Sequence, residues 1–379
     1  MKRATLIIIV GMLCTFGICG GPRAGGGGAD GFHKVSGPCN LTFPHDHGSH
    51  PGYRTEWWYY TGNVQSAGGE RYGFQLTFFR RRIAPPGAES AWPNPSSAWR
   101  TSQIYLAHAA LSDLSAQRYY HRDLAARGAL NLAGACRDAD RTTVFLNNWS
   151  VVITPAGHTL KVRTDEFALD LTARPLKKPV LHGDAGYSRK GRHRDSASCY
   201  YSFTRLETTG ILTLHGKTVS VRGFSWMDQE FSTALLEDNL TGWDWFSLQF
   251  DDGTELMVFF LRQNDDVVSP ASSGTWIAAS GVATHISYEH LSLKVLDTWK
   301  SPHSEGVYPS RWDLTVTEPS LDLEIESNLA DQEMQTPGST GVTYWEGSVS
   351  VRGTAQGTPI VGRGYVEMTG YAAPLDVPM

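Results

Sequence analysis

The sequence predicts an all-β protein made of two antiparallel β-barrels in tandem. The chain has 379 residues, a length that suits two domains of about 150–180 residues each. Short runs in which bulky residues alternate with a period of two follow one another almost throughout, and helical periodicity is nearly absent. An aromatic hairpin also occurs twice, once in each half of the chain.

Strands are predicted where large apolar residues alternate between turn signals. In the segment 72–79 every second residue is a large apolar one, beginning with Tyr72. The segment 254–262 shows the same alternation directly after the turn Asp251-Asp252-Gly253. Further strands are expected over 143–153, 159–162, 167–172, 210–214, 219–223, 291–295, 312–316 and 344–353.

The internal repeat predicts the domain organisation. The aromatic segment 57–64, a turn and the apolar segment 72–80 open the first half, and segments 243–250 and 254–262 repeat this order in the second half. A repeat at this distance indicates duplication of a whole domain, because the period of a solenoid is far shorter. We expect a first barrel over 38–225 and a second over 226–379, with the seam around 215–240.

The N-terminus predicts export. Lys2 and Arg3 precede an uncharged, apolar stretch over 4–21, which has the length of a secretory leader and is short for a membrane span. We expect a signal peptide over 1–21 and a Gly-rich tether over 22–37. Cys19 lies where a lipoprotein signal carries its acylated cysteine, but the residues before it form a poor lipobox. A periplasmic protein and an envelope-anchored lipoprotein therefore both stay open.

Cysteine count and charge narrow the classes of function. Cys39, Cys136 and Cys199 remain after the leader, and an odd number allows at most one intramolecular disulfide and leaves one cysteine over. The sequence has no CxxC spacing, which argues against structural zinc and thioredoxin-like chemistry. The formal net charge is -5 without a basic stripe, so nucleic acid is not an expected partner.

The motifs of several common enzyme classes are missing from the sequence. It contains no G-x-S-x-G elbow, P-loop, HExxH motif or G-x-G-x-x-G after a strand, and Ser188 lies in an imperfect imitation of the first. His45, Asp46, His47 and His50 lie within six positions, a composition that suits a metal. The alternative is a polar segment that closes a barrel mouth, and the Pro- and Gly-flanked spacing favours it. No metal or other cofactor is expected.

Acidic residues beside tryptophans are the most informative feature. Asp228 follows Trp226 by two residues, and Asp244 lies directly before Trp245. A carboxylate surrounded by apolar bulk costs free energy unless it is hydrogen-bonded or functional. Each acid therefore either ties down neighbouring groups or serves a ligand site.

Glu56 precedes a run of four aromatic residues that begins with Trp57 and Trp58. On a strand, alternate rings point to opposite faces, so two of the four line an interior. They form either barrel core or the wall of a ligand pocket with Glu56 at its rim.

Several long segments carry a family resemblance. They are FPHDHGSHPGYRTEWWYYTGNV, LHGDAGYSRKG, SCYYSFTR, GFSWMDQEF, GWDWFSLQFDDGTELMVFFLR, YWEGSVSV and GYVEMTGY. Together they resemble the AttH branch of the carotenoid 1,2-hydratase (CrtC-like) family, over residues 38–372. The resemblance implies two tandem lipocalin-like barrels. It also implies relatives that hydrate the terminal double bond of acyclic carotenoids, or that hydrate or cyclise other large apolar metabolites.

Alkene hydration needs residues of the types found here. It requires a carboxylic acid kept protonated by an apolar pocket, and aromatic faces beside the carbocation that protonation creates. The resemblance implies Asp228 as the acid, and we take Trp226 and Tyr201 as its catalytic neighbours. The candidate ligand-binding residues are Glu56, Trp57, Trp58, Asp244, Trp245 and His47. We expect the acid–aromatic clusters to converge on one cavity near the place where the barrels meet.

The sequence departs from the hydratase pattern beside the acid. The hydratases resemble aromatic-x-Asp-His-Asn there, whereas Gln229 and Glu230 follow Asp228 in this chain. Their upstream histidine-containing segment is replaced by Cys199-Tyr200-Tyr201. Two functions therefore stay open. One is an exported protein that binds a large apolar, isoprenoid- or lipid-like ligand and hydrates it; the other is a non-catalytic carrier or an accessory protein of an envelope export system.

Overall fold

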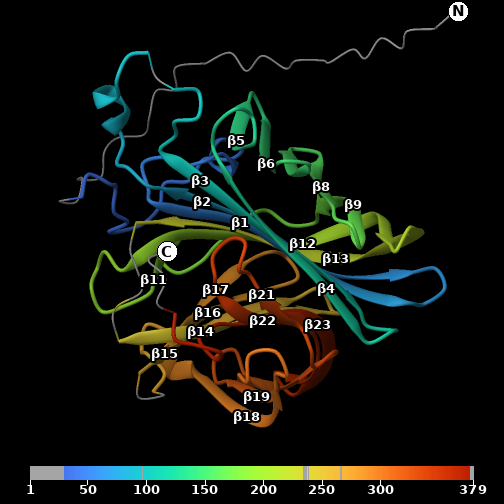
Figure 1. Cartoon of the computed structure of the whole chain (residues 1–379). Helices are drawn as coiled ribbons and strands as arrows, with labels where there is room; N and C mark the ends of the chain where they lie inside the picture. Colours follow the sequence, from blue (N-terminus) through green and yellow to red (C-terminus); the bar gives the residue numbers. More distant parts are fainter. Residues whose placement is uncertain (1–29, 96, 234–236, 238, 265–266, 376–379) are drawn as a thin grey trace, which may run out of the picture.

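The computed structural model describes residues 30–95, 97–233, 237, 239–264 and 267–375. Within them lie two antiparallel sheets, shown one above the other in Figure 1, and the short 3-10 helices η1 (His45–His47), η2 (Ala88–Ala91) and η3 (Tyr288–His290). The predicted signal peptide, Cys19 and the first part of the tether lie outside the described residues. In the part of the chain that the structure describes, no helix is long and apolar enough to cross a membrane.

The first sheet has 13 strands. They are β1 (Thr55–Ser66), β2 (Arg71–Arg82), β3 (Gln103–Asp113), β4 (Arg118–Arg127), β5 (Ala133–Asp138), β6 (Arg141–Leu146), β7 (Trp149–Thr154), β8 (Gly157–Arg163), β9 (Phe167–Pro175), β10 (Val180–Leu181), β11 (Tyr187–Arg189), β12 (Ala197–Leu214) and β13 (Lys217–Ser232). Their order is β4-β3-β2-β1-β13-β12-β9-β8-β7-β6-β5, with β10 and β11 paired to β12. The sheet curls into a nearly closed barrel.

The second sheet has 10 strands. They are β14 (Leu240–Phe250), β15 (Glu255–Gln263), β16 (Ser273–Ile277), β17 (Ala283–Ser287), β18 (Leu291–Lys300), β19 (Val307–Val316), β20 (Leu321–Ser327), β21 (Glu333–Gln335), β22 (Thr343–Ala355) and β23 (Thr358–Met368). Their order is β17-β16-β15-β14-β23-β22-β20-β19-β18, with β21 paired to β22. This sheet curls into a half-barrel.

The two sheets repeat one plan. In the first, β1 pairs with the next strand, β2, and with the last strand, β13. In the second, β14 pairs in the same way with β15 and with the last strand, β23. The predicted all-β fold with tandem lipocalin-like barrels is confirmed. The boundary drawn at 225 falls inside β13, and the chain passes from one sheet to the other between Ser232 and Leu240.

Strand alternation separates the barrel cores from the seam between the sheets. On β1, Trp58 and Tyr60 belong to the core of the first barrel, whereas Tyr59 belongs to a third apolar cluster that contains residues of both sheets. The second half-barrel has its own core, which includes Trp312 and Trp345. We call the third cluster the seam cluster, because it joins the two sheets.

A disulfide fastens the segment before β1 to the first sheet. Cys39 and Cys199 are bonded at a sequence separation of 160, and Cys199 lies on β12. Cys136, the third cysteine, is exposed. One bridge and one cysteine outside it agree with the count made from the sequence.

Candidate functional site

Asp228 is a buried acid on the seam side of β13. It is 4% exposed. The indole of Trp226 donates a hydrogen bond to its Oδ1 at 2.5 Å, the hydroxyl of Tyr200 donates to its Oδ2 at 2.7 Å, and Ser202 donates to Oδ1. Among the described residues no basic group forms an ion pair with it. Burial raises the pKa of Asp228 to about 7, although its three hydrogen bonds act in the opposite direction.

A chain of polar contacts holds the partners of Asp228. Nε2 of His182 lies 2.6 Å from Oγ of Ser202, and Nδ1 of His182 lies 2.9 Å from Oγ1 of Thr275, on β16 of the second sheet. Burial lowers the pKa of His182 to about 3, so its imidazole is neutral at neutral pH and carries one ring proton. The contacts therefore orient Ser202 from both sheets without placing a positive charge beside Asp228.

Aromatic side chains surround this acid. The indole of Trp245 donates to the Tyr200 hydroxyl at 3.0 Å, and its ring centroid lies 5.2 Å from that of Tyr59 and 6.3 Å from that of Trp226. The buried members of the seam cluster are Tyr59, Val180, Tyr200, Trp226, Leu240, Trp245, Met257, Phe259, Leu261, Ile277 and Tyr365, with Trp57, Trp243 and Ala271 partly buried. The acid therefore sits in an apolar, aromatic environment made by both sheets.

Trp58, Tyr201, His47 and Glu56 lie on the other side of the first sheet. Trp58 and Tyr201 belong to the core of the first barrel. Nδ1 of His47 lies 2.7 Å from the Tyr201 hydroxyl, which donates to Gln229 at 2.6 Å. Tyr201 is therefore not a neighbour of Asp228, because successive residues of a strand point to opposite faces. Tyr200 occupies the position that the sequence analysis gave to Tyr201.

Glu56 is a paired structural acid. It is fully buried, and its carboxylate accepts hydrogen bonds from Nε of Arg80 at 3.0 Å and from Nε2 of Gln229 at 2.9 Å. Nδ1 of His50 lies 2.7 Å from its Oε1. Burial raises its pKa, but the charges and hydrogen bonds of its partners outweigh burial and lower the pKa of Glu56 below its usual value. The expected role of Glu56 at a pocket rim does not fit this fully buried network.

Asp244 lies on the barrel side of β14. Its Oδ1 accepts a hydrogen bond from Nε of Arg262 at 3.2 Å, and its Oδ2 accepts one from the Tyr371 hydroxyl at 3.0 Å. Phe246, two residues further along the strand, belongs to the core of the second half-barrel. Burial raises the pKa of Asp244 above its usual value, and the opposing effect of Arg262 is smaller. The acid thus faces away from the seam cluster.

The single cavity expected from the sequence is therefore not found. Asp228, Trp226, Trp245 and Trp57 lie together at the seam, whereas the remaining predicted residues point into one or the other barrel. The physical reason is strand parity, since a cluster that is contiguous in sequence is divided between the two faces of its strand.

Sequence reasoning missed four residues of the seam. They are Tyr200, His182, Glu346 and Glu367. Tyr200 was one position from the residue chosen, and His182 belongs to the quoted segment LHGDAGYSRKG. The two glutamates belong to the quoted segments YWEGSVSV and GYVEMTGY, but only pairing of β22 with β23 brings them opposite each other.

The histidine-rich segment before β1 is fastened by separate contacts. Asp46 accepts hydrogen bonds within its own segment and lies beside His45 and His50, while His47 turns to Tyr201. Among the described residues no group of three or more His, Cys, Asp or Glu side chains is arranged to hold a metal ion. Phe43 and His47 of this segment pack against the rings of Tyr201 and Phe203 in the first barrel.

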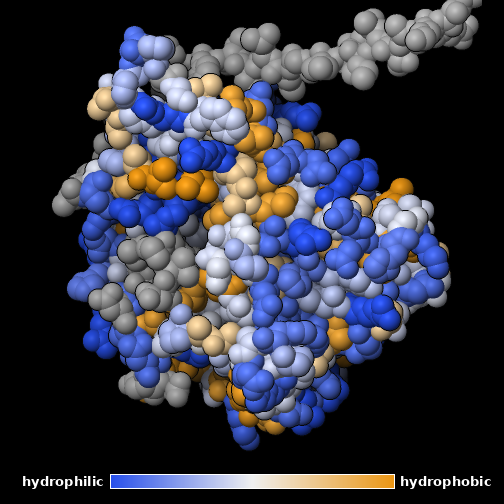
Figure 2. Space-filling view, in the orientation of Figure 1, coloured by the Kyte–Doolittle hydropathy of each residue, from blue (hydrophilic) through white to orange (hydrophobic). Residues whose placement is uncertain are grey.

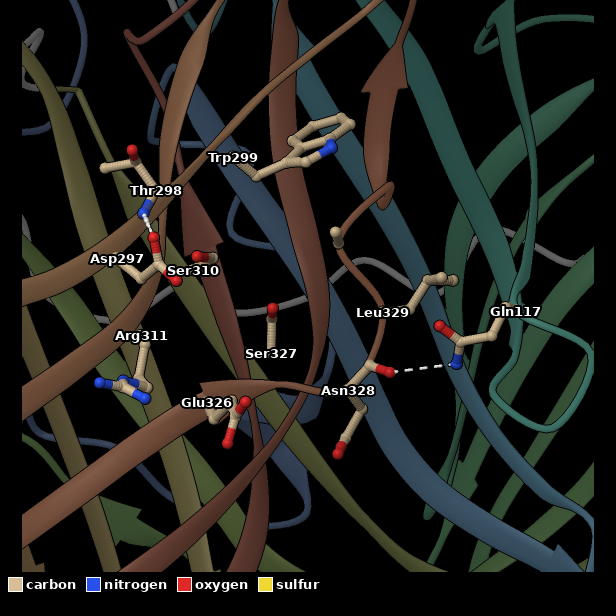
Figure 3. A pocket seen from close by; sticks show the side chains of 11 residues that line it. Gln117, Asp297, Thr298, Trp299, Ser310, Arg311, Glu326, Ser327, Asn328 and Leu329 are labelled. Atoms are coloured by element: carbon tan, nitrogen blue, oxygen red, sulfur yellow. Dashed lines mark hydrogen bonds between the residues drawn. The ribbon is translucent and has the colours of Figure 1, made fainter.

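Two surface hollows lie away from Asp228. One, of about 270 Å³, is lined by Trp299, Arg311, Asn328 and their neighbours, and Gln117 from the turn between β3 and β4 reaches it (Figure 3). The other, of about 660 Å³, includes Arg192 in its lining. Otherwise the face shown in Figure 2 is mostly hydrophilic, with apolar residues in small groups. Neither hollow is lined by Asp228 or by a member of the seam cluster.

The chain is similar to one protein family and to several solved structures. The model of the AttH-like family matches residues 34–371. AttH from Nitrosomonas europaea, a solved structure, is 33% identical and superimposes with a TM-score of 0.79 over 90% of this chain and 100% of that chain. Kievitone hydratase from Nectria haematococca shares the fold, with a TM-score of 0.64 and 15% identity over 90% of this chain and 98% of that chain.

A curated relative is also similar. The dehydratase asqC from Emericella nidulans is 26% identical over 208 residues, which are 52% of this chain and 57% of that protein. The match thus spans little more than half of the relative. Taken with the family match over residues 34–371, these findings show that the chain belongs to the AttH-like family.

Proposed function

We propose that the protein catalyses addition of water to, or its removal from, a carbon–carbon double bond of a large apolar small molecule, with Asp228 as the general acid. The observation that carries this proposal is a buried carboxyl group without a basic partner among the described residues. At a pKa of about 7 a large fraction of Asp228 is protonated at neutral pH. General acids are most effective when their pKa lies near the working pH.

The aromatic surroundings supply the second requirement of the reaction. Protonation of a trisubstituted alkene gives a tertiary carbocation, which the faces of Trp and Tyr rings stabilise. Trp226, Trp245 and Tyr59 lie around Asp228. The relatives named a hydratase and a dehydratase agree with chemistry in which water is added or removed, and the apolar lining favours an isoprenoid- or lipid-like substrate.

A non-catalytic carrier or an export accessory is the less favoured alternative. A carrier of an apolar ligand gains nothing from a buried acid that burial holds partly protonated, because that acid lowers stability when it ionises.

The substrate reaches the seam cluster past its partly exposed members Trp57 and Trp243. It enters as these side chains move apart.

Export is a second part of the proposal. The apolar leader supports it, and so does the Cys39–Cys199 disulfide, since disulfides persist in oxidising compartments such as the periplasm. Intact-mass measurement of the protein from the cell envelope tests it. A mature chain beginning near residues 19–22 is expected, with added lipid mass on Cys19 if the protein is anchored. A full-length cytoplasmic protein would contradict export.

The catalytic proposal is tested with lycopene, an acyclic carotenoid with terminal trisubstituted double bonds. Purified protein is incubated with lycopene in detergent micelles in ¹⁸O-labelled water, and products are analysed by mass spectrometry. We expect a product heavier by one labelled water. Asp228→Asn should lower its formation by about 10²–10⁴-fold, while quenching of tryptophan fluorescence shows that lycopene still binds. Binding by the wild type without any change of mass would instead establish the carrier.

A further inference from the structure

The duplication makes Glu367 the counterpart of Asp228. Asp228 lies on the last strand of the first sheet, opposite Tyr59 on the first strand, β1. Glu367 lies on the last strand of the second sheet, opposite Trp245 on the first strand of that sheet, β14. Both acids follow an aromatic residue by two positions, and both accept a hydrogen bond from an indole N–H. Asp228 and Glu367 are thus equivalent acids of the seam, one from each half.

Glu367 differs from Asp228 in its cross-strand neighbour. Asp228 has Ser202 opposite it on β12, whereas Glu367 has Glu346 opposite it on β22. Glu346 is 1% exposed, and Glu367 is partly exposed. Among the described residues neither glutamate forms an ion pair. Two carboxyl groups placed side by side without a cation do not both ionise easily, so the pair retains a proton.

Two buried polar atoms of the seam belong to residues that adjoin each other, yet neither atom has a hydrogen bond of good geometry among the described residues. They are the hydroxyl of Tyr59 and Oε1 of Glu346. The charges of Glu346, Glu367 and Asp228 all act on Tyr59, which places its hydroxyl among the three acids. A donor and an acceptor left unsatisfied in one buried place are costly, and they are the partners that hold a small hydroxylic molecule such as water.

We propose that Glu367 is the second acid–base group of the hydratase site, and that Tyr59 and Glu346 hold the water that it activates. This inference rests on the proposed function and names the origin of the added hydroxyl group. Asp228 and Glu367 lie on opposite sheets, so the substrate double bond enters between a proton donor and a proton acceptor.

The reaction balances with these groups. The π electron pair of the alkene takes the proton of Asp228, which forms a C–H bond and leaves a tertiary cation and the Asp228 carboxylate. The water oxygen forms the C–O bond to the cation, and the proton that this water loses passes to the ionised carboxylate of the Glu346–Glu367 pair. Glu367 is partly exposed and releases that proton to solvent, and Asp228 takes one up after the alcohol leaves.

The experiment follows two isotopes with lycopene as the probe. Wild type, Asp228→Asn and Glu367→Gln are incubated with lycopene micelles, once in D₂O and once in ¹⁸O-labelled water. Deuterium in recovered lycopene reports protonation of the alkene, and ¹⁸O in the alcohol reports addition of water. Glutamine has the shape of a protonated glutamate, so the fold should be kept. The matched control is Glu333→Gln. Glu333 is a buried acid of the second half-barrel and accepts a hydrogen bond from the Tyr308 hydroxyl.

The expected results separate the two acids. Glu367→Gln should lose about a hundredfold or more of the ¹⁸O product and still exchange deuterium into lycopene, whereas Asp228→Asn loses both and Glu333→Gln neither. Tyr59→Phe should also lower ¹⁸O addition while deuterium still enters, and it serves if Glu367→Gln fails to fold. Hydration that survives in Glu367→Gln and Tyr59→Phe overturns this inference alone. A wild type that neither labels nor hydrates lycopene overturns the proposed function with it.

Discussion

Glu56 and Asp228 are both buried acids of the first sheet, yet they have opposite surroundings. Glu56, on the barrel side, is paired with Arg80 and His50. Asp228, on the seam side, receives hydrogen bonds from uncharged groups only. The partners of Glu56 lower its pKa, whereas burial raises that of Asp228 to about 7. Charged partners thus favour the ionised form of Glu56, whereas burial without a cation favours the protonated form of Asp228.

Removing the cation beside Glu56 should have the largest effect on stability. Arg80→Met leaves a buried carboxylate without its guanidinium, and breaking a buried ion pair in this way costs about 3–5 kcal/mol. Urea unfolding measures it. Arg174→Met is the control, because the Arg174–Glu207 pair is exposed and its loss should change stability by about 0.5 kcal/mol or less. Equal effects of the two variants would show that burial does not distinguish these ion pairs.

The pH dependence of stability should differ between the two acids. The folded pKa of Glu56 is lowered, so its contribution to stability is present above its unfolded pKa and is lost as pH falls through the folded pKa. Glu56→Gln should therefore be less stable than wild type near neutral pH, with a smaller loss on acidification. Thermal unfolding at a series of acidic pH values measures this. If the variant and wild type lost equal stability on acidification, the ionised Glu56 would not stabilise the fold.

Tyr200 and Tyr201 offer a matched pair for a smaller effect. Tyr200 donates to Asp228, and its hydrogen bond lowers the pKa of that acid. Tyr200→Phe should therefore raise the pKa of Asp228 further, at a cost of about 1 kcal/mol for the lost hydrogen bond. Tyr201→Phe changes contacts on the barrel side only. Infrared titration of the carboxylic acid band measures the pKa of Asp228. An equal shift of this pKa in both variants would contradict the placement of Tyr200 and Tyr201 on opposite faces of β12.

Much of the fold was accessible from the sequence because its signals are local. Alternation marked the strands, and the repeated hairpin implied the equivalence of β1 with β14. The acid–aromatic segments also indicated Asp228, Trp226 and Trp245, which the structure brings together at the seam. The family resemblance, which covers residues 38–372, also implied the two lipocalin-like barrels.

The face to which each side chain points was not accessible, because it depends on register. Choosing Tyr201 over Tyr200 was an error of one residue, and that is enough to move a side chain across the sheet. His182 directly follows the two-residue strand β10, whose pairing no periodicity predicts. Glu346 and Glu367 meet only through pairing of β22 with β23, a contact that alternation within each strand does not predict.

The measurement that tests the central claim most directly compares the unfolding free energy of wild type and Asp228→Asn from about pH 4 to about pH 9. Because the folded pKa of Asp228 is raised to about 7 from 3.8, its contribution to stability is present below the unfolded pKa and is lost as pH rises through the folded pKa. We therefore expect wild type to lose a few kcal/mol relative to the variant across this range. A variant less stable than wild type by a constant amount at every pH would contradict the account, since Asp228 would then be an ordinary structural carboxylate.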